Sequence, residues 1–203
     1  MEEALQLTRD QAETNLTFVG LLVMENTLKK ETTPALRLLN NANIASIMVT
    51  GDNPLTACYV AVACKLVKKT KKIYLSTIVE GQGVVWQNIH DARAPPVELF
   101  QLLFGGNQEY GTTGLNSPSY ERINSLKQNV NKEVELAVTG TAFEQLLKNP
   151  QEFATVLEYA HVYARMKPDQ KQKLVESLED CGLTVGMCGD GANDCGALKA
   201  ADV

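Results

Sequence analysis

Several features that mark whole classes of protein are absent from this 203-residue chain. No apolar run approaches the roughly 20 residues that a membrane-spanning helix requires, since the longest runs, residues 18–24 and 57–64, are the size of core elements. A basic excess is also absent, because the net charge is −5, and this argues against nucleic acid as a partner. The acidic start does not resemble a signal peptide. We therefore expect a globular, soluble chain.

Cysteine and histidine are scarce. The five cysteines are odd in number and include no Cys-x-x-Cys pair, which argues against a zinc site and a disulfide framework. We expect free and mostly buried thiols in a reducing compartment. Of the two histidines, His161 lies beside a short predicted strand and is expected to be structural, and His90 to lie at the surface.

Short apolar runs alternate with helical patterns along most of the chain. The runs that predict strands are 16–24, 44–49, 73–78, 84–89, 136–139, 162–164 and 183–188. Prolines suit the first turns of the predicted helices, which start near Pro34, Pro54, Pro150 and Pro168. This alternation predicts an α/β fold with a doubly wound, mostly parallel sheet of the Rossmann-like type.

The middle of the chain is less regular. Residues 80–132 are interpreted as an irregular insertion at the edge of the sheet, and 105–131 are too rich in Gly, Asn, Ser and Thr to assign structure. Trp86 falls in this segment and could either pack or bind a ligand. A basic run, Lys68 to Lys72, is expected to be a solvated edge, although contact with anionic lipid stays open.

Two loops of similar chemistry follow predicted strands. Thr50-Gly51-Asp52 follows the run 44–49, and Gly189-Asp190-Gly191 follows the run 183–188. In a parallel sheet both loops face the edge at which open α/β sheets bind ligands. An ordinary Asx turn is the alternative for the second loop taken alone.

The second loop brings carboxylates together. Asp190 and Asp194 would repel each other at the end of one strand unless a proton or a cation lay between them. Carboxylate, amide and carbonyl oxygens suit a hard cation, and Mg²⁺ is the usual one. Asn193 or Asp194 can also cap a helix that continues through residues 197–201.

A lysine completes the set. Lys171 lies three and four residues before Leu174 and Val175, on the inward stripe and in the first turn of its helix. A cation is disfavoured in the first turn of a helix unless an anion lies close to it. The alternative is a lysine whose amino group extends to solvent. With the Thr50 hydroxyl and the bare Gly51 N–H to cradle phosphate, the combination predicts a phosphoryl-transfer site.

These motifs resemble a known family. Thr50-Gly51-Asp52, the run 164–171 with Lys171, and residues 187–201 look like the haloacid-dehalogenase superfamily, and more closely like the phosphorylation domain of P-type ATPases. Residues 18–26 and 187–201 are similar to the type V subgroup, which is regarded as polyamine or cation transporters of endomembranes. The resemblance covers most of 16–66 and 136–203.

The resemblance implies residue roles, with ATP as the substrate and Mg²⁺ as the cofactor. Thr50 and Gly51 would contact the transferred phosphoryl group, and Asp52 would brace the loop and help to position the nucleotide phosphates. Lys171 would neutralise phosphate charge.

It also implies a metal set at the second loop. Asp190 would ligate Mg²⁺, while Asn193 and Asp194 would orient the phosphoryl group and the metal shell.

The chain departs from the family in one respect. The family's nucleophile is the aspartate of an Asp-Lys-Thr-Gly-Thr motif, and that motif does not occur here. We therefore expect the C-terminal part of a truncated phosphorylation domain, inactive alone, of low stability or self-associating, at the cytosolic face of an endomembrane. Its partners would be the remaining nucleotide-binding, actuator and membrane domains of the pump. The alternatives are a soluble phosphatase of the same superfamily and a non-catalytic interaction module.

Overall fold

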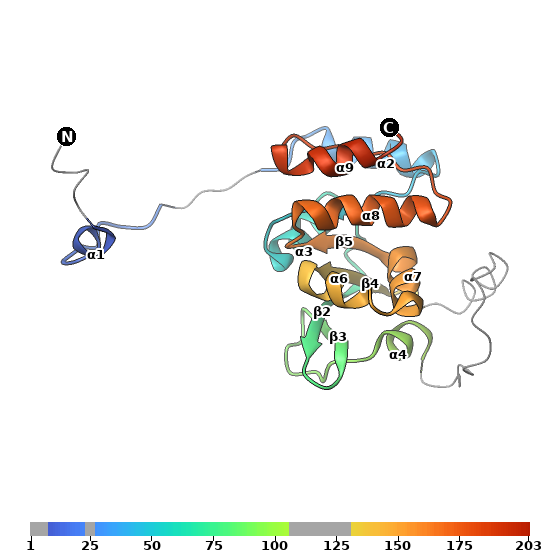
Figure 1. The fold of residues 1–203 in the computed structure, drawn as a ribbon, viewed down its shortest axis with the longest axis horizontal. Coiled ribbons are helices and arrows are strands. Elements are labelled where there is room, and N and C mark those ends of the chain that lie inside the picture. Colours follow the sequence, from blue (N-terminus) through green and yellow to red (C-terminus); the bar gives the residue numbers. More distant parts are fainter. Residues whose placement is uncertain (1–7, 23–26, 106–130) are drawn as a thin grey trace.

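The computed structural model describes residues 8–22, 27–105 and 131–203. Their strands form one five-stranded sheet in the order β1-β5-β4-β2-β3 (Figure 1). The strands are β1 (Met48–Val49), β2 (Lys72–Val79), β3 (Gly83–Asn88), β4 (Val134–Thr139) and β5 (Ala160–Ala164). The first four strands of that spatial order are parallel, and β3 pairs with β2 as an antiparallel edge strand.

Helices precede, connect and follow the strands. They are α1 (Arg9–Ala12), α2 (Thr32–Asn41), α3 (Pro54–Ala63), α4 (Leu99–Phe104), α6 (Gly140–Leu146), α7 (Pro150–Tyr159), α8 (Pro168–Asp180), the 3₁₀ turn η2 (Ala192–Asp194) and α9 (Cys195–Ala200). The side chain of Asn53 caps α3 by accepting from the Leu55 N–H at 2.9 Å, and Pro54 then occupies the first turn. Among the described helices, none has both the length and the apolar character needed to cross a bilayer.

Helices cover both faces of the sheet. Along β4, Leu136 and Val138 belong to one core cluster, which includes side chains of α6, α7 and α8. Ala137 points to the opposite face and joins a second cluster with Ala57 and Ala61 of α3. This three-layer arrangement is the α/β, mostly parallel sheet that the alternation of strands and helices predicts, and it agrees with a Rossmann-like fold.

The segment predicted as an irregular insertion adds structure to the sheet in its described part. Trp86 lies on β3, is fully buried, and packs in the main core with Leu99 and Leu102. Its backbone N–H donates to the Val97 carbonyl oxygen at 2.9 Å. Trp86 is therefore a core residue, which resolves the alternative that the sequence leaves open. Residues 106–130 lie outside the described part.

The predicted strand 16–24 is wrong over its described residues. Residues 16–22 form no strand, and the side chains of this run are 72–97% exposed at Leu16, Phe18, Val19, Leu21 and Leu22. A strand needs a neighbour to bond its backbone groups, and no described segment pairs with this run. The predicted strand 44–49 is likewise shorter, since only Met48 and Val49 pair with β5.

The predicted strand 183–188 is also wrong. The segment pairs only with the end of the chain, where the Met187 N–H donates to the Val203 carbonyl oxygen at 2.9 Å. No described strand lies on the outer side of β1, where the sheet ends. The prediction of mostly buried thiols is wrong as well, because Cys181, Cys188 and Cys195 are exposed. Cys58 and Cys64 are buried, and all five are free.

Candidate functional site

The carboxyl ends of the parallel strands bring several loops to one edge of the sheet. Val49 of β1 is in register with Tyr163 of β5, and Thr139 of β4 is in register with Ala164. The loop 50–52, the start of α6 and the start of α8 therefore share this edge. This is the edge at which open α/β sheets place ligands.

The loop 50–52 is tied to the segment that follows β5. The Thr50 N–H donates to the Tyr163 carbonyl oxygen at 2.9 Å, and the Met166 N–H donates to the Thr50 carbonyl oxygen at 3.0 Å. The Arg165 N–H donates to the Asp52 carbonyl oxygen at 3.0 Å, with Arg165 itself in the left-handed region at φ 53°. Backbone bonds thus hold this loop in place whatever its side chains do.

Within the loop, the hydroxyl oxygen of Thr50 accepts from the Asp52 N–H at 3.1 Å. This is an ST-type turn, which explains the tight reversal after β1. Gly51 is exposed, and a Cβ there would lie 3.8 Å from its nearest neighbour, the Met166 carbonyl oxygen. Gly51 is therefore not required by packing, and among the described residues its backbone N–H has no hydrogen-bond acceptor.

Lys171 and Asp194 form an ion pair at the same edge. The Lys171 Nζ donates to Asp194 Oδ1 at 2.7 Å, and the two side chains are only 11% and 12% exposed. Lys171 is thus an inward side chain in the first turn of α8, as predicted, and the Asp194 carboxylate offsets its charge. The hydrogen bond from Lys171 is the largest influence on the pKa of Asp194, and it lowers that pKa against the opposing effect of burial.

Gly189 allows Asp194 to take this position. A Cβ at residue 189 would lie 2.8 Å from the Asp194 Cβ and from its Oδ2, a distance that real Cβ atoms do not show. The turn η2 brings the chain back to this contact, and the Asp194 N–H donates to the Gly191 carbonyl oxygen at 3.0 Å. The glycine is therefore required by the approach of the carboxylate.

The remaining predicted residues are exposed beside this pair. Asp190 and Asn193 lie in the same loop as Asp194, facing solvent. Among the described residues, no group of three or more His, Cys, Asp or Glu side chains is clustered as a metal site. The oxygens present are nevertheless of the type that Mg²⁺ prefers, and Asp194 Oδ2 is not the atom that Lys171 engages.

Sequence reasoning missed Gln170, which connects two helix starts at this edge. Gln170 is 96% buried. Its Nε2 donates to the Gly140 carbonyl oxygen at 3.0 Å and to Glu144 Oε1 at 2.6 Å. Its Oε1 accepts from the Lys167 N–H at 2.9 Å. It lies at the third position of α8, where a Gln commonly closes a capping box, and this spacing could have indicated it.

Gly140 makes room for this connection. A Cβ at residue 140 would overlap the Arg165 carbonyl oxygen and would lie 2.6 Å from Gln170 Oε1. The start of α6 therefore lies directly against the segment between β5 and α8. Gln170 and Gly140 together fix the first turn of α8, which carries Lys171, relative to the end of β4.

No protein-family model matches the chain. It is 38% identical over 204 residues to the polyamine-transporting ATPase 13A2 of Homo sapiens, an alignment that covers 100% of this chain. It is also 38% identical over 208 residues to the vacuolar cation-transporting ATPase YPK9 of Saccharomyces cerevisiae, over 98% of this chain. The chain spans only 16% and 13% of the lengths of these two relatives.

Proposed function

Because this chain is homologous over nearly its whole length to type V P-type ATPases, we propose that it is the part of such a pump that binds phosphate and Mg²⁺. It would form the C-terminal part of a phosphorylation domain of the haloacid-dehalogenase type. The observation that carries this proposal is the buried ion pair of Lys171 and Asp194, which joins the start of α8 to the loop 189–194.

The phosphate side of the site is the loop 50–52 with Lys171. The Gly51 N–H and the Thr50 hydroxyl hydrogen are available to donate to phosphate oxygens, since Thr50 Oγ1 serves the Asp52 N–H only as an acceptor. Asp52 holds the turn through its backbone. Lys171 supplies a point charge that can be shared between Asp194 and an incoming phosphoryl oxygen.

The metal side is the loop 189–194. Asp190 and the second oxygen of Asp194 would hold Mg²⁺, with the Asn193 amide oxygen as a further ligand or as a partner of the phosphoryl group. When bound, Mg²⁺ supplies charge neutralisation for a transferring phosphoryl group. The low pKa of Asp194 keeps its carboxylate ionised and able to ligate a cation.

The acceptor of the phosphoryl group lies outside these residues. The sequence contains no Asp-Lys-Thr-Gly-Thr motif, so we propose that the loops act on an aspartyl-phosphate formed on another segment of an ATP-driven pump for polyamines or cations. The other domains of that pump would be the partners of this chain. Its place would be the cytosolic face of an endomembrane.

A Mg²⁺ titration tests the metal side. Backbone amide signals of Gly189 and Gly191 should shift on addition of Mg²⁺, and Asp190→Asn should abolish the shift. Asp180→Asn removes the same charge from the exposed end of α8 and should leave it intact. Shifts unaffected by Asp190→Asn would contradict the assignment.

A chimera tests the phosphate side. With this chain in place of its matching segment in a type V pump, Lys171→Met should reduce phosphoenzyme formation about a hundredfold or more, as loss of one preorganised donor to a transition state does. The purified chain alone should show no steady ATP hydrolysis. Hydrolysis by the chain that Asp190→Asn abolishes would instead indicate a nucleophile of its own.

A further inference from the structure

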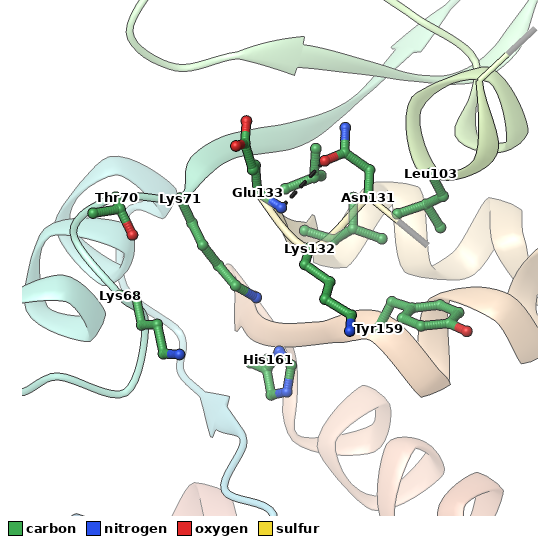
Figure 2. Close-up of a pocket in the computed structure, with 11 residues that line it drawn as sticks. Lys68, Thr70, Lys71, Leu103, Asn131, Lys132, Glu133, Tyr159 and His161 are labelled. Atoms are coloured by element: carbon green, nitrogen blue, oxygen red, sulfur yellow. Dashed lines mark hydrogen bonds between the residues drawn. The ribbon is translucent and has the colours of Figure 1, made fainter. Parts of the chain in front are cut away.

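A hollow lies at the opposite edge of the sheet from these loops, where the parallel strands begin. It has a volume of about 540 Å³. Most of its lining comes from three places: Lys68, Thr70 and Lys71 before β2, residues 131–134 at the start of β4, and Tyr159 with His161 at the junction of α7 and β5 (Figure 2). The volume lies within the range of about 300–1,000 Å³ that small-molecule sites occupy.

Cationic side chains from all three walls converge on this space. In Figure 2 the amino groups of Lys68, Lys71 and Lys132 point toward the ring of His161. Lys68 and Lys132 are exposed, and the amino group of neither one has a hydrogen bond or an ion pair with any other residue in the described part of the chain. The carboxylate of Glu133 points away from the group in the same view.

A buried carboxylate fixes two of these groups. Glu135 is only 2% exposed, its Oε2 accepts from Lys71 Nζ at 2.8 Å, and its Oε1 lies 2.8 Å from His161 Nδ1. The His161 backbone N–H also donates to Oε1, at 3.3 Å. Lys71 and the imidazole ring are therefore held in place before any ligand arrives. One carboxylate offsets Lys71, and the charges of Lys68 and Lys132 are left uncompensated.

The rest of the wall is apolar. Leu103, Leu136 and the ring of Tyr159 line the hollow beside the amino groups. Apolar walls lower the local dielectric constant, so that each lysine attracts an anion more strongly than it would on an open surface. A basic run that alone indicates a solvated edge is therefore, in three dimensions, one wall of a charged hollow.

We propose that this hollow binds a phosphate-bearing anion with more than one negative charge. Ammonium groups that approach from separate elements act as point charges and suit a tetrahedral, multiply charged group. A planar carboxylate would favour the paired donors of an arginine, and no arginine lines the hollow. The site shares no residue with the loops at the other edge, so it stands independently of the function proposed for them.

Such an anion has two sources, a soluble phosphorylated small molecule and the headgroup of a phosphorylated lipid. Two probes distinguish them: inositol trisphosphate in solution, and vesicles of phosphatidylcholine with and without phosphatidylinositol bisphosphate. Binding of the soluble probe as tight as that of the vesicles assigns a small molecule. Binding that requires the vesicles assigns a lipid headgroup.

The test uses the 203-residue chain and the double variant Lys68→Gln/Lys132→Gln. Because both lysines are exposed and unpaired in the described structure, these changes leave the fold intact. Calorimetric affinity for the probe that binds should fall about tenfold or more, since charge-assisted hydrogen bonds are lost. Affinity should also fall as salt rises.

The matched control is Lys29→Gln/Lys30→Gln, which removes the same two charges at exposed positions outside the hollow. It should bind as the unaltered chain does. Three results would overturn the proposal: no binding of either probe, an unchanged affinity of the Lys68→Gln/Lys132→Gln variant, or an equal loss in the control.

Discussion

At the scale of single residues, the ion pair between Lys171 and Asp194 has a structural and a chemical role. Its two side chains are nearly buried, so each one depends on the other to offset the cost of leaving water. The same two groups are those that the proposed function assigns to phosphate and to Mg²⁺. The contribution of this ion pair to stability can therefore be separated from its proposed role in binding only by comparing variants.

Lys171→Met should lower the free energy of unfolding. The change leaves the Asp194 carboxylate without its partner at a site that is 12% exposed, and a buried polar group left unpaired costs about 1–3 kcal/mol. Urea denaturation measures the difference. Lys173→Met, on the exposed face of the same helix, should change stability by less than about 0.5 kcal/mol. Equal losses in the two variants would contradict the pairing.

Glu135 should make stability depend on pH in acid. Burial alone would raise the pKa of Glu135, but hydrogen bonds and charges from His161 and Lys71 outweigh burial and lower it below the ordinary value of 4.5. The folded state thus gains stability above pH 4.5 and loses it as the pH falls through the lower folded pKa.

Denaturation at a series of pH values tests this. Glu135→Gln should flatten the acid limb of the stability curve, whereas Glu133→Gln, at an exposed position, should leave it unchanged. An acid limb that is the same with and without Glu135 would place its source elsewhere.

Gly140→Ala should destabilise the chain by about 1–3 kcal/mol, because overpacking a filled site costs that much. Its Cβ would overlap the Arg165 carbonyl oxygen, which is backbone and cannot rotate away. Gly51→Ala is the matched control, since its Cβ would lie 3.8 Å from the nearest atom, the Met166 carbonyl oxygen. Thermal melts of the two variants give the comparison, and a tolerated Gly140→Ala would show that the start of α6 can move.

At the scale of elements, the strands that the sequence predicts correctly are those with partners on both sides or with a hairpin partner. The runs 73–78, 136–139 and 162–164 lie within β2, β4 and β5, and the run 84–89 matches β3 except for its last residue. The runs 16–24 and 183–188 are also apolar but, over the described residues, have no neighbour in the sheet. An apolar run indicates that a segment tends to be buried, whereas strand formation also depends on whether a neighbouring strand is there to pair with it.

For the candidate site too, the sequence predicts local positions but not contacts between distant residues. The positions of Thr50, Lys171 and Asp194 followed from local patterns, because each stands at a fixed offset from a strand end or a helix start. The direct bond between Lys171 and Asp194 did not follow, since the two residues are 23 apart in sequence. Glu135 was missed for the same reason, because its partners Lys71 and His161 are distant in the sequence.

Cysteine labelling should report the state of the segment 183–188. Cys188 and Cys195 are exposed and should react rapidly with a maleimide. Cys181 should react more slowly, because burial and the nearby charge of Asp180 raise its pKa. Cys58 should react only on unfolding, since burial, and then the charge of Glu135, raise its pKa to about 11. Mass spectrometry after brief exposure identifies the labelled residues. Protection of Cys188 would mean that this segment is packed in the sheet.

At the scale of the whole molecule, the described structure has both an open sheet edge and an exposed apolar run. β1 pairs only with β5 in the described structure, and the run 16–22 exposes five large apolar side chains by 72–97%. Open strand edges and exposed apolar runs are the features through which chains associate.

The chain should therefore self-associate as its concentration rises. Sedimentation equilibrium should give a mass that increases with loading, and Phe18→Asp with Leu21→Asp should lower it, since both side chains are exposed and apolar. A monomer with a single cooperative melt that does not depend on concentration would contradict this expectation.

The strand β5 has only five residues, and it extends from the end of the sheet that carries the hollow to the end that carries the loop 50–52. Near its start, His161 bonds Glu135, and at its end Tyr163 and Arg165 bond the loop 50–52. Sliding a strand by one position turns every side chain to the other face. A single-residue insertion or deletion here would thus disrupt the hollow and the loop 50–52 together. Length variation among natural or engineered versions of this chain should avoid β5 altogether.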